Sequence, residues 1–379
     1  MKINSFIIPV FVIIANFGCT SQPSTLSKIN RAEFQTTVDG KLTNLYYLKN
    51  QDGIEITVTN FGARIVELFV PDREGKFEDI VLGHDHINKY VNYGKTARFL
   101  GSTIGRYGNR IAKGKFTLDD VEYILPINNS PNSLHGGTKG FDMLVWDARQ
   151  IDLQTIEFRL VSPDGDQGYP GTLTVYMTYQ LNDDNELVIV HQATTDKKTV
   201  VNLTHHSFFN LHGAGNGTIN DHIMMINASN YTPVDSTLIP EGTIAMVEGT
   251  PMDFRIPTAI GERVDHDFVQ LRYGRGYDHN WVLDRKTPNE LEQAAVIYEP
   301  VSGRVMEVWT TEPGIQFYGG NFLDGMWTGK EGKSYDFRAS FAIETQHYPD
   351  SPNRPDFPST VLEPGKNYYH MCVYKFGIK

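Results

Sequence analysis

The stretch TLTVYMTYQL, residues 172–181, decides the fold class because its apolar side chains recur at every second position. Leu173, Val175, Met177 and Tyr179 fall on one face of an extended chain, and mostly threonine falls on the other. This period of two is typical of a β-strand with one buried face, whereas a helix repeats its apolar residues about every 3.6 positions. The stretch therefore predicts a strand that packs one face against a core.

The same alternation recurs from Ile54 to the C-terminus, and no long stretch holds the helical period. We predict further strands at residues 54–59, 186–192, 304–310 and 315–318, separated by turn sequences such as Asp52-Gly53 and Asp164-Gly165. Residues 31–379 contain no repeat, low-complexity tract or linker, so we expect a single domain there. An all-β chain of this length must bury both inner sheet faces, which predicts a large antiparallel β-sandwich.

The composition suits a globular protein with a large core. The chain has 379 residues, of which 40% are hydrophobic and 21% charged. Its net charge is −11 and its pI is near 5.5, and the lysines and arginines are scattered along the sequence. A nucleic-acid partner would favour a basic stripe, so we expect none.

Residues 1–18 are predicted to be a secretion signal. Lys2 supplies a positive start, and the apolar run at 6–14 is too short to span a bilayer. Gly18 followed by Cys19 suggests lipoprotein processing, with Cys19 as the lipidated N-terminus. The alternative is plain cleavage, with Cys19 incidental. We therefore expect an exported protein, anchored to a membrane through its lipid or otherwise periplasmic.

The segment that would follow cleavage, residues 19–30, is rich in serine, threonine and lysine and is expected to be a flexible tether. Cys19 and Cys372 are the only cysteines of the chain. If Cys19 is acylated, Cys372 has no disulfide partner, so we expect it to be a small buried apolar residue.

The most distinctive polar stretch is NLTHHSFFNLHG, residues 202–213, in which two histidines are adjacent. On a strand, His205 and His206 point to opposite faces, so only one of them can enter a given pocket. This weakens a zinc interpretation, because two strand histidines that share one metal prefer a spacing of two. Taken alone, either histidine is more often a hydrogen-bonded structural residue.

Glu344 lies in ASFAIETQ, residues 339–346, where alternation separates it from Phe341 and Ile343 and places it beside Ala342. A carboxylate near a strand end and among apolar neighbours is a candidate general base. The alternative is an ordinary solvated strand residue.

Three further positions are candidates for ligand contact. His135 lies in PNSLHGG, where two glycines allow close approach, and Arg110 follows Asn109 in a glycine-rich segment that lacks the lysine of a phosphate loop. Asp278 lies in GYDHNW beside aromatic residues, and a sugar site needs both acceptors for hydroxyls and rings for its apolar face. A structural ion pair for Arg110 and a turn aspartate at Asp278 are the alternatives.

Seven motifs, taken in their order along the chain, resemble the aldose 1-epimerase (galactose mutarotase) family. They are Asn109-Arg110-Ile111, Leu134-His135-Gly136-Gly137, Asn202 to Leu211, Tyr277-Asp278-His279, Gly314-Ile315-Gln316, Glu344-Thr345-Gln346 and Phe357-Pro358-Ser359-Thr360. The resemblance covers most of the chain from Ile54 onward. It implies a galactose mutarotase-like β-supersandwich that interconverts the α and β anomers of a free aldose such as glucose or galactose, without cofactor or metal.

By this resemblance Glu344 is the general base for the C1 hydroxyl and His206 is the general acid for the ring oxygen. Unperturbed pKa values of about 4.3 for Glu and about 6.5 for His would leave the carboxylate ionised at neutral pH. A nearby carboxylate can also keep an imidazole protonated, so an ion pair is expected.

The resemblance also implies substrate contacts. His135 would hydrogen-bond near the reacting centre, Asn109 and Arg110 would contact the sugar, and Asp278 and Gln316 would hold its hydroxyls. The expected partner is a monosaccharide, an aldohexose, and both monomer and dimer remain open.

The sequence departs from the family pattern in modest ways. Ser130 stands where glycine is frequent, Phe208 where tyrosine is frequent, and His212 where alanine or serine is common. None of these is an acid or base position, but Phe208 and His212 could change which sugar fits.

Three other functions are compatible with parts of this pattern. A glycoside hydrolase would use Asp278 and Glu344 as a carboxylate pair. A sugar-binding module would need the aromatics and carboxylates but no matched acid and base. A hexose-6-phosphate epimerase would need several basic residues, and these motifs offer essentially Arg110.

Overall fold

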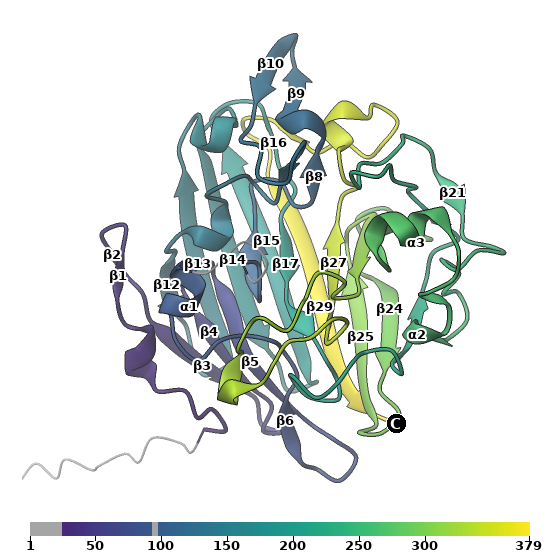
Figure 1. The fold of residues 1–379 in the computed structure, drawn as a ribbon. Coiled ribbons are helices and arrows are strands. Elements are labelled where there is room, and N and C mark those ends of the chain that lie inside the picture. Colours follow the sequence, from purple (N-terminus) through teal and green to yellow (C-terminus); the bar gives the residue numbers. More distant parts are fainter. Residues whose placement is uncertain (1–24, 93–97) are drawn as a thin grey trace, which may run out of the picture.

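The protein is described here by a computed structural model over residues 25–92 and 98–379, and its strands form three main antiparallel sheets (Figure 1). The largest sheet has nine strands. In spatial order they are β12 (Asp147–Gln150), β13 (Thr155–Ser162), β14 (Leu173–Leu181), β15 (Glu186–Thr195), β29 (Tyr368–Ile378), β25 (Arg304–Thr310), β24 (Glu292–Tyr298), β19 (Ile223–Ile226) and β22 (Thr258–Ala259).

Two smaller sheets complete the main framework. The six-stranded sheet runs β18 (Phe208–Phe209), β27 (Phe341–Gln346), β26 (Gly314–Tyr318), β23 (Asp278–Val282), β20 (Asn230–Tyr231) and β21 (Ala245–Met246). The four-stranded sheet runs β3 (Leu45–Lys49), β4 (Glu55–Thr59), β5 (Arg64–Pro71) and β6 (Phe77–Asp79).

Short strand pairs and helices connect these sheets. The pairs are β1 (Thr37–Val38) with β2 (Lys41–Leu42), β7 (Ser102–Ile104) with β17 (Thr204–His206), β8 (Arg110–Ile111) with β11 (Ser133–Leu134), β9 (Lys115–Leu118) with β10 (Val121–Ile124), and β16 (Thr199–Val200) with β28 (Val361–Leu362). The α-helices are α1 (Asn88–Val91), α2 (Ile260–Arg263) and α3 (Val269–Gly274). Within the described ranges, no helix is long and apolar enough to cross a membrane.

The main core lies between the sheets and confirms the predicted all-β sandwich. One hydrophobic cluster joins Val175 and Met177 of the nine-stranded sheet, Ile56 of the four-stranded sheet, and Phe317 and Ile343 of the six-stranded sheet. The predicted buried face of β14 is confirmed, because its odd-numbered residues are buried while its even-numbered residues are partly or fully exposed. The strands predicted at 54–59, 186–192, 304–310 and 315–318 are also observed as β4, β15, β25 and β26.

The N-terminal segment differs from the expected flexible tether over its last six residues, 25–30. Thr25 Oγ1 and the Leu26 amide both donate to Glu55, and Ser27 Oγ donates to Glu67. Asn30 caps the turn that follows, so this part belongs to the folded domain. The carboxylates of β4 and β5 bind the segment, which composition alone did not indicate. Cys19 and residues 1–18 lie outside the described residues, whereas Cys372 is buried and unpaired as predicted.

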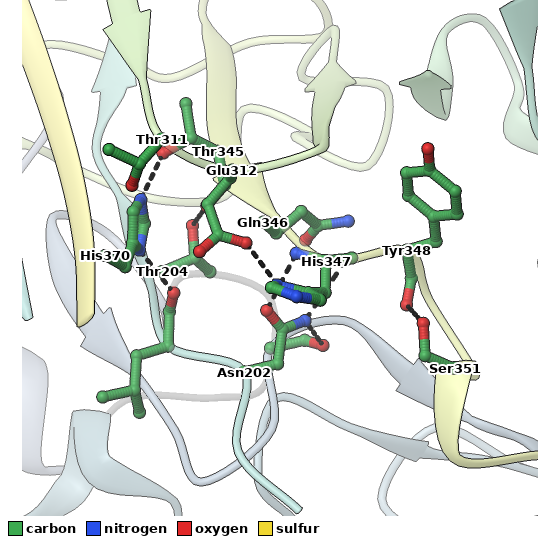
Figure 2. Close-up of polar contacts among 12 residues, drawn as sticks. Asn202, Thr204, Thr311, Glu312, Thr345, Gln346, His347, Tyr348, Ser351 and His370 are labelled. Carbon is green, nitrogen blue, oxygen red and sulfur yellow. Dashed lines mark hydrogen bonds and ion pairs between the residues drawn. The ribbon is translucent and has the colours of Figure 1, made fainter. Parts of the chain in front are cut away.

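A polar network joins β17, β27 and β29 (Figure 2). Thr204 Oγ1 donates to the Thr345 carbonyl at 2.9 Å, which links β17 to β27. His370 of β29 lies 3.0 Å through Nδ1 from the Leu203 carbonyl and 2.8 Å through Nε2 from Thr345 Oγ1. One imidazole therefore holds the start of β17 and the end of β27 at a fixed separation.

His347, directly after β27, forms a partly buried ion pair with Glu312 at 2.5 Å between Nδ1 and Oε2 (Figure 2). Burial by itself lowers the pKa of His347, but the attraction of Glu312 raises it above its ordinary value. Burial by itself raises the pKa of Glu312, and the attraction of His347 and His370 brings it below its ordinary value. Asn202 completes the network, because its side chain bonds the His347 amide and carbonyl and the Gly108 carbonyl.

Met177→Ala should destabilise the fold by about 2–5 kcal/mol, because it leaves a cavity between the sheets. Gln180→Ala, on the exposed face of the same strand, is the control and should change the free energy of unfolding by no more than about 0.5 kcal/mol. Urea denaturation measures both. Equal losses would contradict the assignment of the two faces of β14.

The Glu312–His347 pair should make stability depend on pH in a defined window. The raised pKa of His347 contributes stability that is complete below pH 6.5 and is lost as the pH rises through its folded value. The lowered pKa of Glu312 contributes stability that is complete above pH 4.5 and is lost as the pH falls through its folded value. The parent should therefore exceed a Glu312→Gln/His347→Gln double variant in free energy of unfolding, and this difference should be largest between pH 4.5 and pH 6.5.

Denaturation of both proteins at about pH 5.5 and about pH 9 checks this difference. A stability difference that is the same at both pH values would show that the pair does not titrate as described.

Candidate active site

The structure brings the seven candidate residues together around the end of β17 and the polar face of the six-stranded sheet. His206 ends β17, Glu344 lies in β27, Gln316 in β26 and Asp278 begins β23. Arg110 begins β8 directly after Asn109, and His135 follows β11. Each of the seven residues is between 2% and 7% exposed, so each keeps slight contact with solvent.

Strand register positions the carboxylate side of the site. Gln316 pairs directly with Glu344 across β26 and β27, and Asn280 pairs with Gln316 across β23 and β26. Because side chains alternate, these residues share one face of the sheet, while Phe317 and Ile343 point into the main core from the other. The six-stranded sheet thus has an apolar face for the core and a polar face for the site.

His206 and Glu344 are in direct contact. His206 Nε2 lies 3.4 Å from Glu344 Oε1. The imidazole stacks on Phe99 at 5.9 Å and on Phe208 at 4.9 Å between ring centroids, which fixes its plane. His205 points to the opposite face, as predicted, where it contacts the Tyr179 hydroxyl at 3.0 Å and Ser207 Oγ at 2.6 Å.

His135 is held as a neutral hydrogen-bond donor. The Asn109 amide donates to His135 Nδ1 at 3.0 Å, and burial lowers the pKa of His135 well below its ordinary value, so Nε2 carries the ring hydrogen. The ring meets His206 edge to face at 5.1 Å. The backbone here has φ values of 51° at His135 and 83° at Gly136, and a side chain at Gly136 would collide with the Gly105 carbonyl.

Arg110, Asp278 and Gln316 form a second connected group. Gln316 Nε2 donates to Asp278 Oδ1 at 2.7 Å, and Arg110 Nη2 lies 3.6 Å from Asp278 Oδ2. Arg110 is also held by Asn129 at 3.1 Å through Nε. Since both Asp278 oxygens are engaged, this carboxylate is suited to hold a hydroxyl group in place.

The protonation of the central pair differs from the ion pair expected from unperturbed pKa values. Burial lowers the pKa of His206 to about 3. Burial, reinforced by the charge of Asp278, raises the pKa of Glu344 well above its ordinary value. Burial therefore favours the uncharged form of each group, and at neutral pH the imidazole is neutral rather than the cation of an ion pair.

Several polar atoms of this cluster are left for a ligand. Within the described part of the chain, Glu344 Oε2, Gln316 Oε1 and His206 Nδ1 are buried without a hydrogen-bond partner. Buried polar atoms are nearly always bonded, so such atoms at one place point to a polar ligand that supplies the missing bonds.

Three of these residues are close enough together to be considered as metal ligands. Nitrogen or oxygen atoms of His135, His206 and Glu344 lie within 4.8 Å of one another. His135 does not fit a ligand role, however. Its Nδ1 accepts the Asn109 amide hydrogen and its Nε2 carries the ring hydrogen, so neither nitrogen has a lone pair free for an ion.

Phe99 is a residue of the candidate site that the sequence analysis did not identify. It packs against both His206 and His135, with a centroid distance of 4.6 Å to the latter. An isolated phenylalanine before a glycine-rich segment carries no periodic signal, so only its tertiary contacts reveal the role. Asn129, which orients Arg110, was missed for the same reason.

Two cavities lie elsewhere, and none of the seven residues lines either of them. One of about 1110 Å³ is bounded by the N-terminal segment and by Phe69, Phe77 and Lys330. Another of about 700 Å³ lies beside His347 and Tyr368. The unpartnered polar atoms and the perturbed pKa values nevertheless make the His206–Glu344 cluster the candidate reactive site.

Comparisons with known proteins agree with this fold. Galactose mutarotase from Bos taurus is 44% identical over 92% of this chain and 99% of that protein. Aldose 1-epimerase from Escherichia coli K12 is 36% identical over 89% of this chain and 96% of that protein.

Two solved structures show the same architecture. An aldose epimerase homologue from C. elegans superposes with a TM-score of 0.81 at 31% identity, covering 89% of this chain and 99% of that one. Galactose 1-epimerase from Lactobacillus acidophilus superposes with a TM-score of 0.78 at 29% identity, covering 90% of this chain and 97% of that one. Residues 44–375 match the aldose 1-epimerase family model, and the chain therefore belongs to the aldose 1-epimerase family.

Proposed function

We propose that the protein is an aldose 1-epimerase, an isomerase that interconverts the α and β anomers of a free aldose such as glucose or galactose. The observation that carries this proposal is the direct contact of His206 Nε2 with Glu344 Oε1 at 3.4 Å, in a site where burial shifts the pKa values of both groups. The two oxygens that must exchange protons, O1 and O5, are both bonded to C1 of the sugar. Two groups standing side by side can therefore reach both oxygens at once.

Ring opening uses the pair in its ionic form. A proton passes from Glu344 Oε1 to His206 Nε2, and hydroxyl donors of the bound sugar stabilise the carboxylate that remains. Glu344 then accepts the proton of the C1 hydroxyl while His206 donates to the ring oxygen. The C1–O5 bond breaks and the C1–O1 double bond forms, which gives the open-chain aldehyde.

Ring closure uses the pair in its neutral form. After rotation about C1–C2, the O5 hydroxyl attacks C1 from the other face. His206 takes the O5 proton and Glu344 returns a proton to O1, which yields the other anomer. Burial favours this neutral form, in which Glu344 carries a proton and His206 is uncharged. The two groups are therefore in the form that ring closure needs as soon as the ring has opened.

The remaining residues position the sugar. His135 donates through Nε2 near the reacting centre, and Asn109 and Arg110 provide further polar contacts. Asp278 and Gln316 are fixed by their mutual hydrogen bond, which lets them select the orientation of the ring hydroxyls. A hydrolase that used Asp278 as a free catalytic carboxylate would conflict with its bonds to Gln316 and Arg110.

Fresh α-D-glucose or α-D-galactose should lose its optical rotation faster in the presence of the protein, and Glu344→Gln should reduce this acceleration by about 100-fold or more because the general base is lost. Sugar binding should persist, since glutamine retains the shape of the side chain. Glu74→Gln makes the same chemical change at an exposed position outside the site and should leave the rate unchanged.

Polarimetry measures the rates, and calorimetry with sugar measures binding. A Glu344→Gln rate equal to that of the parent would show that the base is assigned wrongly. No acceleration of any aldose by the parent protein would refute the proposed function itself.

We also propose that the protein is exported and attached to a membrane through a lipid on Cys19. The support is the sequence of residues 1–18 with the Gly18-Cys19 junction. Mass spectrometry of the mature N-terminus should find a lipid-modified cysteine as the first residue, and Cys19→Ser should abolish the modification. An unmodified first residue other than Cys19 would disprove the anchor and leave the catalytic proposal untouched.

A further inference from the structure

A second group of ligand atoms lies outside the reactive site. One nitrogen or oxygen atom from each of His212, Asp221 and Glu299 lies within 4.8 Å of the other two. His212 follows β18, Asp221 lies in the turn before β19, and Glu299 directly follows β24. The three residues therefore come from three separate segments that meet at one edge of the sandwich.

Glu299 is a buried and pre-oriented carboxylate. Its side chain is 0% exposed, and its Oε1 and Oε2 accept the amide hydrogens of Val301 and Ser302 at 2.7 and 2.6 Å. Each amide hydrogen bond occupies one lone pair of its oxygen, so each oxygen retains a second lone pair for an ion.

Asp221 is oriented by a buried imidazole. His222 Nε2 accepts the Leu211 amide hydrogen at 3.0 Å, which places the ring hydrogen on Nδ1, and this nitrogen lies 3.2 Å from Asp221 Oδ1. A histidine that hydrogen-bonds a ligating carboxylate is the kind of supporting partner found around bound metal ions. The Asp221 side chain is 55% exposed, so an ion can reach it from solvent.

His212 supplies the one nitrogen atom among the three candidate ligand atoms. Its Nδ1 lies 3.6 Å from Glu299 Oε1, and its side chain is 37% exposed. In a tetrahedral zinc site with bonds of about 2.0–2.1 Å, neighbouring ligand atoms are separated by roughly 3.4 Å. The observed pair is therefore close to the spacing of two ligands of one ion.

We propose that His212, Asp221 and Glu299 bind a divalent zinc ion at a site separate from the His206–Glu344 site. One imidazole and two carboxylates suit a first-row divalent ion, and two carboxylate charges balance that of Zn²⁺. Water completes the coordination on the exposed side. The ion would cross-link three segments of the folded chain, so its binding should stabilise the protein.

The test uses the full chain, treated with chelator and then titrated with Zn²⁺ by isothermal calorimetry and thermal denaturation. We expect one Zn²⁺ per chain and a rise in Tm of about 2–5 °C at a hundredfold excess of metal over Kd. His212→Ala and Asp221→Asn should each weaken binding by about 10-fold or more and remove most of the rise in Tm. His266→Ala, an exposed histidine outside the group, is the matched control and should behave like the parent.

Two further outcomes would overturn the proposal. One is a parent protein whose Tm does not respond to Zn²⁺ and whose titration shows no binding. The other is binding that His212→Ala and Asp221→Asn leave unchanged but that His206→Ala abolishes, because the ion would then occupy the reactive site. The Glu344→Gln variant, which alters only the reactive site, should bind Zn²⁺ as the parent does, so a failure of the epimerase proposal does not affect this test.

Discussion

The antiparallel register of β26 and β27 is the constraint on which the reactive site depends. It places Gln316 opposite Glu344, and the next pairing along the sheet, between β23 and β26, brings Asp278 within hydrogen-bond reach of Gln316. A slip of one residue would turn Glu344 into the apolar core and Ile343 into the site. The bond from Thr204 to the Thr345 carbonyl and the contacts of His370 then fix β17 relative to β27. His206 and Glu344 are therefore positioned by strand pairing.

The alternation of apolar residues was sufficient to predict individual strands and their buried faces. It separated Glu344 and Ala342 from Phe341 and Ile343, and the structure places these pairs on opposite faces of β27. The order of strands was not predictable in this way. The C-terminal strand β29 lies between β15 and β25, which are far from it in the sequence, and only long-range packing determines that placement.

Motif resemblance selected seven residues that the structure brings together, but it did not select the groups that orient them. Phe99, Asn129 and His370 act through tertiary contacts that leave no local pattern. The same limit applies to the segment 25–30, whose polar composition suggested a free tether. Its hydroxyl and amide groups instead donate hydrogen bonds to carboxylates on β4 and β5. Composition does not show which distant residues a segment will contact. Unperturbed pKa values failed at the central pair for a related reason, since burial of both side chains outweighs their mutual attraction.

The close contact of His206 with Glu344 also bears on how the protein exchanges hydrogen with its surroundings. In the proposed cycle the ionic and neutral forms of the pair have the same total charge and contain the same number of hydrogens. In each half of the cycle one hydrogen passes from the sugar to the pair and another passes from the pair to the sugar, so none has to be drawn from bulk water. A site with so little solvent contact can therefore turn over repeatedly without a water channel or a relay of side chains to the surface.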